Sequence, residues 1–165
     1  MSNKVVFSLL VDNEAGVLSR VAGLFSRRGY NIDSLTVGET QDKRHSRMTV
    51  VAEGEPAVLE QIEKQLAKLV DVSKIQMLPA DASVCRELIL IKVAAKPQDR
   101  AQVIAIADIF RAKIVDVGEE SMMIELTGND SKLDACTKLL EKFTILELAR
   151  TGITGLSRGS ENSLS

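Results

Sequence analysis

The order of predicted secondary-structure elements repeats along this chain, and the repeat constrains the fold more strongly than any other feature of the sequence. Near-continuous apolar runs indicate strands, and apolar residues spaced three and four apart indicate helices. The first half contains strands at 5–11, 32–40, 48–53 and 70–78, with helices between Gly16 and Gly29 and from Pro56 to Leu69. The second half contains strands at 87–94, 114–118, 122–127 and 145–153, with helices at 98–111 and from a cap at Asn129 or Asp130 through Phe143. Each half therefore has the order strand, helix, strand, strand, helix, strand.

Two such units predict an α+β fold with two ferredoxin-like βαββαβ domains, each an antiparallel four-stranded sheet that carries its helices on one face. The small and polar segment Pro79–Ser83 marks the break between them. We therefore expect domains at 1–79 and 80–165, the second ending in a frayed polar tail from Ser157 onward.

The size of each unit favours association with a second copy, because a lone core of about 80 residues is marginal. We expect a homodimer that pairs edge strands or helix-free sheet faces. The residues predicted on those exposed or paired surfaces are Leu35, Val37, Val50 and Ala52.

Composition and charge exclude several kinds of partner. A net charge of −2 provides no basic field for nucleic acid, and four Phe and one Tyr give few platforms for base stacking. No segment approaches the roughly 20 apolar residues of a membrane span, so we expect a cytoplasmic protein. Cys85 and Cys136 are far apart and lack CxxC spacing, which argues against a zinc or redox site.

Candidate catalytic residues are sparse. The single histidine, His45, falls in the polar connector 41–47, where we expect a solvated hairpin loop. Glu119 and Glu120 fall in a predicted tight turn, where charges are usually solvated. The sequence also lacks GxGxxG, Walker and GxSxG motifs. These absences argue against a small enzyme with a sheet-lined pocket, and we expect no catalysis by this chain alone.

A polar turn, Asp12–Gly16, ends the first apolar strand and precedes the first helix. Backbone N–H groups at a helix N-terminus form a ready site for a carboxylate. A second amide side chain, Asn31, stands at the start of the next strand. The alternative is a purely structural turn, in which Asn13 caps the helix and Gly16 permits tight geometry.

The residue types around this turn suit a zwitterionic amino acid. Such a ligand needs N–H donors for its carboxylate, acceptors for its ammonium and an apolar wall for its side chain. The turn provides the donors, while Asn13, Asn31 and free carbonyls provide the acceptors. The apolar wall comes from Val17, Leu18 and Ile32.

The same residues carry a resemblance to a known family. The blocks VDNEAGVLSRV at 11–21 and GLFSRRGYNIDSLTV at 23–37 closely resemble the small regulatory subunits of acetohydroxyacid synthase, also called acetolactate synthase. Shorter matches extend the resemblance over nearly the whole chain: SRMT at 46–49, QIEKQL at 61–66, KLVDV at 68–72, REL at 86–88, FRA at 110–112, KLDA at 132–135, ARTG at 149–152 and GLSRG at 155–159.

The resemblance implies that the N-terminal unit is an ACT domain, a module that senses amino acids, and that the second unit is a regulatory ferredoxin-like domain. Members of the family associate with a large catalytic subunit, which carries thiamine diphosphate, Mg²⁺ and FAD and condenses pyruvate with pyruvate or 2-oxobutyrate. No cofactor is implied for the small subunit, which raises that activity and confers feedback inhibition by valine or another branched-chain amino acid. The implied effector site comprises Asn13, Glu14, Ala15, Gly16, Val17, Leu18, Asn31 and Ile32, with Asn31 contributed by the neighbouring copy.

The second unit lacks an equivalent motif. Its matching turn, 94–99, has no Asn-x-x-Gly, and Pro97 removes a backbone donor, so we expect no valine site there. A stand-alone amino-acid-binding or transcriptional regulator of ACT type is the alternative function. A transcriptional regulator would need a helix-turn-helix or a basic surface, and neither is visible in the sequence.

Overall fold

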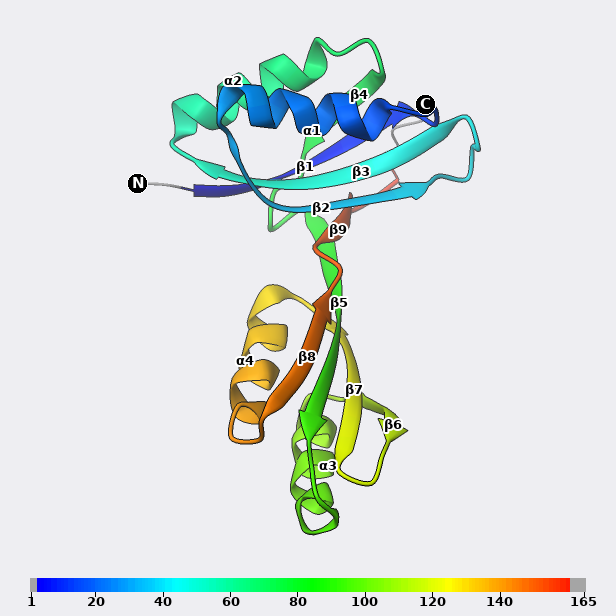
Figure 1. Cartoon of the computed structure of the whole chain (residues 1–165). Coiled ribbons are helices and arrows are strands. Elements are labelled where there is room, and N and C mark those ends of the chain that lie inside the picture. The colour runs from blue at the N-terminus through cyan, green and yellow to red at the C-terminus, as the bar shows by residue number, and fades with distance from the viewer. Residues whose placement is uncertain (1–2, 161–165) are drawn as a thin grey trace. The chain divides into compact units, whose positions relative to one another are not determined.

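The computed structural model describes residues 3–160, which form two compact units (Figure 1). The first unit contains the described residues up to Cys85 together with those from Ile153 onward, and the second spans Arg86–Gly152. The predicted α+β class with two antiparallel sheets is confirmed, because each unit builds its own sheet from the predicted order of elements.

The first unit has four antiparallel strands in the order β2-β3-β1-β4, with both helices on one face of the sheet (Figure 1). Its elements are β1 (Asn3–Asp12), α1 (Val17–Arg28), β2 (Asn31–Glu39), β3 (His45–Gly54), α2 (Pro56–Ala67) and β4 (Val72–Met77). The almost continuously apolar β1 is central, as its composition predicts. Gly29, in the left-handed conformation, ends α1 where the sequence predicts a stop.

The core of the first unit lies between the sheet and the two helices. Its fully buried side chains include Phe7 and Leu9 of β1 and Ile62 of α2. The placement of Val50 and Ala52 on exposed or paired surfaces is wrong, because both are completely buried in this core.

The register of β2 against β3 explains these positions. Leu35 lies opposite Val50, so it shares the helix-covered face and packs against the same core. Of the residues predicted on exposed or paired surfaces, only Val37, near the end of the edge strand β2, has an exposed side chain.

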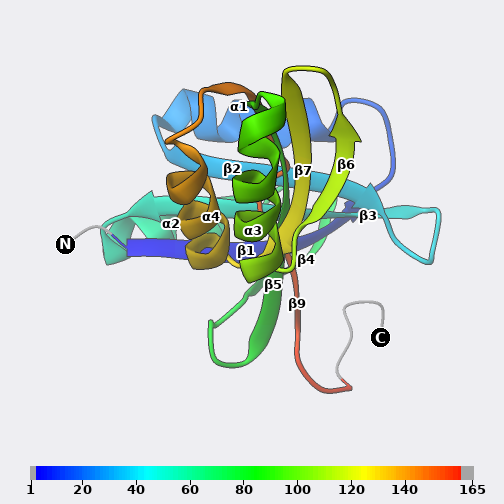
Figure 2. The ribbon, with the colours of Figure 1, turned by 90° about the horizontal axis from the view of Figure 1, so that it is seen from below.

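The second unit repeats the arrangement, with strand order β6-β7-β5-β8. Its elements are β5 (Ser83–Ala94), a short 3₁₀ turn η1 (Pro97–Asp99), α3 (Arg100–Ile109), β6 (Lys113–Val117), β7 (Ser121–Gly128), α4 (Asp130–Leu140) and β8 (Ile145–Arg150). Figure 2 shows α3 and α4 side by side against this sheet. Asn129 is the cap of α4, because its Oδ1 accepts a hydrogen bond from the Lys132 N–H at 3.0 Å.

The C-terminal segment departs from the predicted frayed tail. Residues Thr154–Ser157 form a further strand, β9, which pairs with β5, and Ser157 therefore belongs to a strand. Residues 161–165 of the predicted tail lie outside the described part of the chain. The compact units divide within β5, after Cys85, whereas the break in composition predicts a boundary after residue 79. As a division into functional domains, 1–79 and 80–165 stays a prediction.

Within residues 3–160, no helix combines the length and the apolar character that crossing a membrane requires.

Candidate functional site

The turn between β1 and α1 leaves the N-terminus of the helix open. Gly16 occupies the N-cap position with φ of +88°, a conformation that other residues adopt at a cost. No side chain caps this helix, and its first turn carries no acidic residue. The first backbone N–H groups of α1 are therefore free to bind an anion from solution.

Asn13 ties the turn to the hairpin between β2 and β3. Its Nδ2 donates to the carbonyl oxygen of Lys43 at 2.9 Å and to Oε1 of Glu39 at 3.2 Å. Its Oδ1 accepts a hydrogen bond from Ser46 Oγ at 3.1 Å, and its backbone N–H donates to the carbonyl of Arg44 at 2.8 Å. The Asn13 side chain thus fixes the position of the turn, and Asn13 does not cap the helix.

Asp71 supports the turn from the side of β4. Its backbone carbonyl accepts the Asp12 N–H at 2.9 Å, and its carboxylate binds Arg20 through Nε at 2.5 Å and Nη2 at 3.1 Å. This guanidinium lowers the pKa of Asp71 through the side-chain hydrogen bond. Neither Asp71 nor Arg20 is among the predicted site residues, because no motif or spacing links residues 51 positions apart.

The hairpin next to the turn differs from the predicted solvated loop 41–47. His45 is the first residue of β3, with a side chain 23% exposed, and its Nδ1 lies 3.4 Å from Oδ2 of Asp42. Arg44 binds the same carboxylate at 2.7 Å and lowers the pKa of Asp42. Among the residues that the structure describes, no group of three or more His, Cys, Asp or Glu is placed to hold a metal ion.

The predicted apolar wall is only partly available to a ligand. The side chain of Val17 is buried in the core, whereas Leu18 is 47% exposed and Ile32 is half-buried. Glu14 and Ala15 are exposed on the turn. Of the predicted apolar wall, Leu18 and Ile32 are therefore the two side chains that a ligand can reach.

Asn31 lies at the opposite end of the sheet from the turn. It pairs with Glu53 at the start of β2, whereas Glu39, at the end of β2, pairs with Ser46 beside the turn. Eight residues at about 3.3 Å each separate Asn31 from Glu39 by roughly 26 Å. One chain therefore does not bring Asn31 and Ile32 to the turn.

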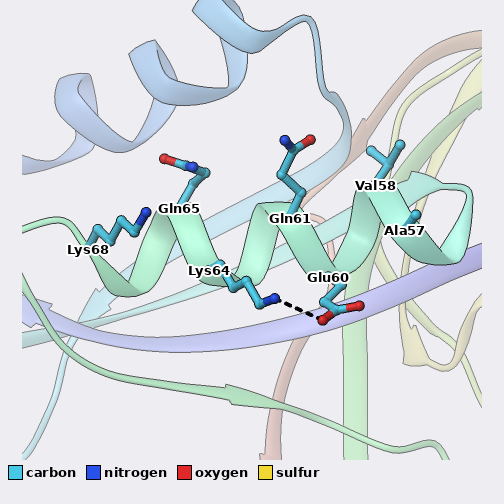
Figure 3. A pocket seen from close by; sticks show the side chains of 7 residues that line it. All are labelled: Ala57, Val58, Glu60, Gln61, Lys64, Gln65 and Lys68. Atoms are coloured by element: carbon cyan, nitrogen blue, oxygen red, sulfur yellow. Dashed lines mark ion pairs between the residues drawn. The ribbon is translucent and has the colours of Figure 1, made fainter.

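A shallow surface hollow runs along α2 and contains none of the predicted site residues (Figure 3). It is lined by Ala57, Val58, Glu60, Gln61, Lys64, Gln65 and Lys68. Lys64 pairs with Glu60 across one turn of this helix at 3.0 Å. Most of its lining side chains end in charged or amide groups, and Ala57 and Val58 are its two apolar residues.

A ferredoxin-like unit with an open helix N-terminus beside a fixed polar turn is typical of a regulatory, ACT-type domain. Comparison with models of known protein families identifies the family. Residues 7–74 match the model of the AHAS small subunit-like ACT domain, and residues 86–159 match the model of the small subunit of acetolactate synthase.

Relatives match over nearly their whole length. The probable acetolactate synthase small subunit of Methanothermobacter thermautotrophicus is 50% identical over 94% of this chain and 93% of its own. The acetolactate synthase small subunit of Mycobacterium bovis is 53% identical over 92% of this chain and 90% of its own. The crystal structure of the small subunit from Thermotoga maritima superposes with a TM-score of 0.88 at 41% identity, covering 96% of this chain and 99% of that one. This chain belongs to the acetolactate synthase small subunits, which are regulatory and non-catalytic.

Proposed function

We propose that this chain binds valine, or another branched-chain amino acid, between two copies of its first unit and thereby inhibits a large catalytic subunit of acetolactate synthase that it otherwise activates. The cofactors of the reaction, thiamine diphosphate, Mg²⁺ and FAD, belong in this proposal to the catalytic subunit. The observation that carries the shared site is the separation of roughly 26 Å between Asn31 and the end of β2 beside the turn.

The position of β2 supplies a geometry for the shared site. β2 is an edge strand, and its two ends lie at opposite ends of the sheet (Figure 1). A two-fold axis that pairs β2 with β2 of a second copy, antiparallel, sets the start of one strand beside the end of the other. Asn31 and Ile32 of one copy then lie near the Asp12–Gly16 turn of its neighbour, and each dimer contains two such sites.

Valine regulates in this scheme because it contacts both copies. Its carboxylate binds the N–H groups at the start of α1, and its side chain rests on Leu18 and Ile32. A ligand shifts an equilibrium only through a difference in affinity between two states, so valine must bind more tightly to the less activating arrangement of the dimer. A coupling of about 1–3 kcal/mol corresponds to roughly 5–150-fold effects.

The first experiment measures acetolactate formation by the catalytic subunit, by this chain and by the mixture. We expect this chain to raise the activity and valine to suppress that increase. Gly16→Asp places a carboxylate where the effector carboxylate binds, so it should relieve inhibition while activation persists. Gly159→Asp is the control for backbone strain, because Gly159 has the same φ of +88° and lies outside the turn. Valine binding without any effect on the catalytic subunit would favour a stand-alone sensor instead.

A mixing experiment tests whether the site is shared. Gly16→Asp and Asn31→Ala dimers should each be insensitive to valine. A mixed dimer of the two variants contains one site with an intact turn and an intact Asn31, and random reassortment of equal amounts makes half of the dimers mixed. Mixing should therefore restore about a quarter of all sites. If mixing restores no sensitivity, the two residues do not act across an interface.

A further inference from the structure

The corner that contains the turn also holds a carboxylate that no sequence motif marks. Glu39 is the last residue of β2, its side chain is exposed, and its Oε1 accepts a hydrogen bond from Asn13 Nδ2 at 3.2 Å. β2 ends at the same end of the sheet at which α1 begins (Figure 1). The carboxylate thus contacts the turn that leads into α1.

The side chain of Asn13 is largely occupied by the protein itself. Nδ2 donates to the carbonyl of Lys43 and to Glu39, and Oδ1 accepts from Ser46. An ammonium group presents three donors and needs acceptors, for which a carboxylate is a stronger partner than an amide oxygen. Asn13 is therefore better suited to orient an acceptor than to be the main acceptor.

Glu39 differs from the neighbouring carboxylates in the charge of its partner. Asp71 is bound by the guanidinium of Arg20, and Asp42 by that of Arg44. Glu39 is bound by the neutral amide of Asn13, which leaves its negative charge uncompensated at this contact. A cationic ligand group therefore gains more from Glu39 than from either aspartate.

We propose that the Glu39 carboxylate binds the ammonium group of the effector, with Asn13 as the positioning residue that orients it. This inference rests on the proposed function and identifies the group that selects an amino acid. The helix N-terminus holds the ligand carboxylate, and Glu39 discriminates against acids that lack an ammonium group. The oxo acids and fatty acids of the same carbon skeleton are then rejected, because their single negative charge faces Glu39 without a counter-charge.

The test is a calorimetric titration of the full chain with valine and with 3-methylbutanoate, which has the same branched carbon skeleton and a carboxylate but no ammonium. Glu39→Gln keeps the shape of the side chain and a hydrogen-bond acceptor and removes the charge. We expect this variant to bind valine at least about 10-fold more weakly, because a charge-assisted hydrogen bond is lost. We expect its affinity for 3-methylbutanoate to stay the same or to rise, because a repulsion is removed.

Glu60→Gln is the matched control, since Glu60 is an exposed glutamate on α2 that pairs with Lys64 away from the turn. It should leave both affinities unchanged. An equal loss for both ligands in Glu39→Gln, or no loss of valine affinity, overturns the inference while the proposed function stands. If the unsubstituted chain binds no branched-chain amino acid, the proposed function fails and this inference fails with it.

Discussion

Gly155→Ala tests whether the C-terminal segment belongs to the first unit. Gly155 lies in β9, which pairs with β5, and its φ lies outside the left-handed region, so an alanine is not excluded by its backbone. What opposes an alanine at this position is the lack of space for its Cβ. A Cβ at this position would lie 2.6 Å from the sulfur of Cys85, 3.0 Å from the carbonyl oxygen of Val84 and 3.2 Å from Cδ1 of Leu78.

The cost of this substitution follows from which of these atoms can move. The Leu78 methyl group can turn away, but the Val84 carbonyl belongs to the backbone of β5, so relief requires β9 to shift. Overpacking of this kind costs about 1–3 kcal/mol. Because β9 has only four residues, we expect the strain to be relieved by detachment of β9 from β5 rather than by unfolding of the whole unit. At 1.4 kcal/mol per tenfold change, about 2 kcal/mol corresponds to a roughly 30-fold larger detached population.

Limited trypsin digestion measures that population, because Arg158 directly follows β9 and its N–H donates to the Ala82 carbonyl at 2.8 Å. Cleavage at Arg158, followed by mass spectrometry, should be about 10- to 30-fold faster in the variant, because cleavage follows the population of the open form. Gly38→Ala is the control, since Gly38 is also in a strand of the first unit and a Cβ added to it would have no atom within 4 Å. If Gly155→Ala is cleaved no faster than Gly38→Ala, β9 does not pack on β5.

Two further predictions concern the stability of the first unit, for which the fluorescence of Tyr30, the single tyrosine, is a reporter during urea unfolding. Gly23→Ala should raise the free energy of unfolding by about 0.5–1 kcal/mol, because Gly23 lies inside α1 and a Cβ there would meet only the flexible end of Arg27. Asp71→Asn should destabilise at pH 7, and this effect should diminish progressively as the pH falls below about 4, since the folded pKa of Asp71 lies below its unfolded value. The ion pair with Arg20 therefore stabilises above the unfolded pKa and is lost as the pH falls through the folded one. A destabilisation of equal size at pH 3 and pH 7 would contradict this assignment.

Periodicity predicted most of the fold because each unit is built from local patterns. The central position of β1 followed from its continuous apolar run, and the caps at Gly29 and Asn129 followed from residue type. The sequence did not predict correctly which residues of the first sheet are exposed, since Val50 and Ala52 are buried. Which side of β3 carries Val50 depends on its register with β1, which alternation within one strand does not determine when nearly every residue is apolar.

The C-terminal strand escaped prediction for a different reason. Thr154–Ser157 is short and lies in a polar region, and its partner is more than 60 residues earlier in the chain, so no local signal marks it as a strand. The residues that hold the candidate site in place are likewise far apart in the sequence. The turn was visible in the sequence, but Glu39, Ser46 and Asp71 reach it through pairing between strands.

The two units differ at the start of their first helix, and this difference gives a physical reason why the proposed ligand site belongs to the first unit. In the second unit the chain enters α3 through η1, where the Asp99 carboxylate accepts the Lys96 N–H at 3.3 Å and places a negative charge directly before α3. In the first unit the equivalent position is Gly16, without a side chain, and the acidic side chain nearby is Glu39 on another strand. An anionic ligand is repelled where the helix carries its own carboxylate and attracted where it does not. In the proposed site a zwitterion therefore has its carboxylate at the start of α1, which carries no acidic residue, and its ammonium group at Glu39 on the end of β2.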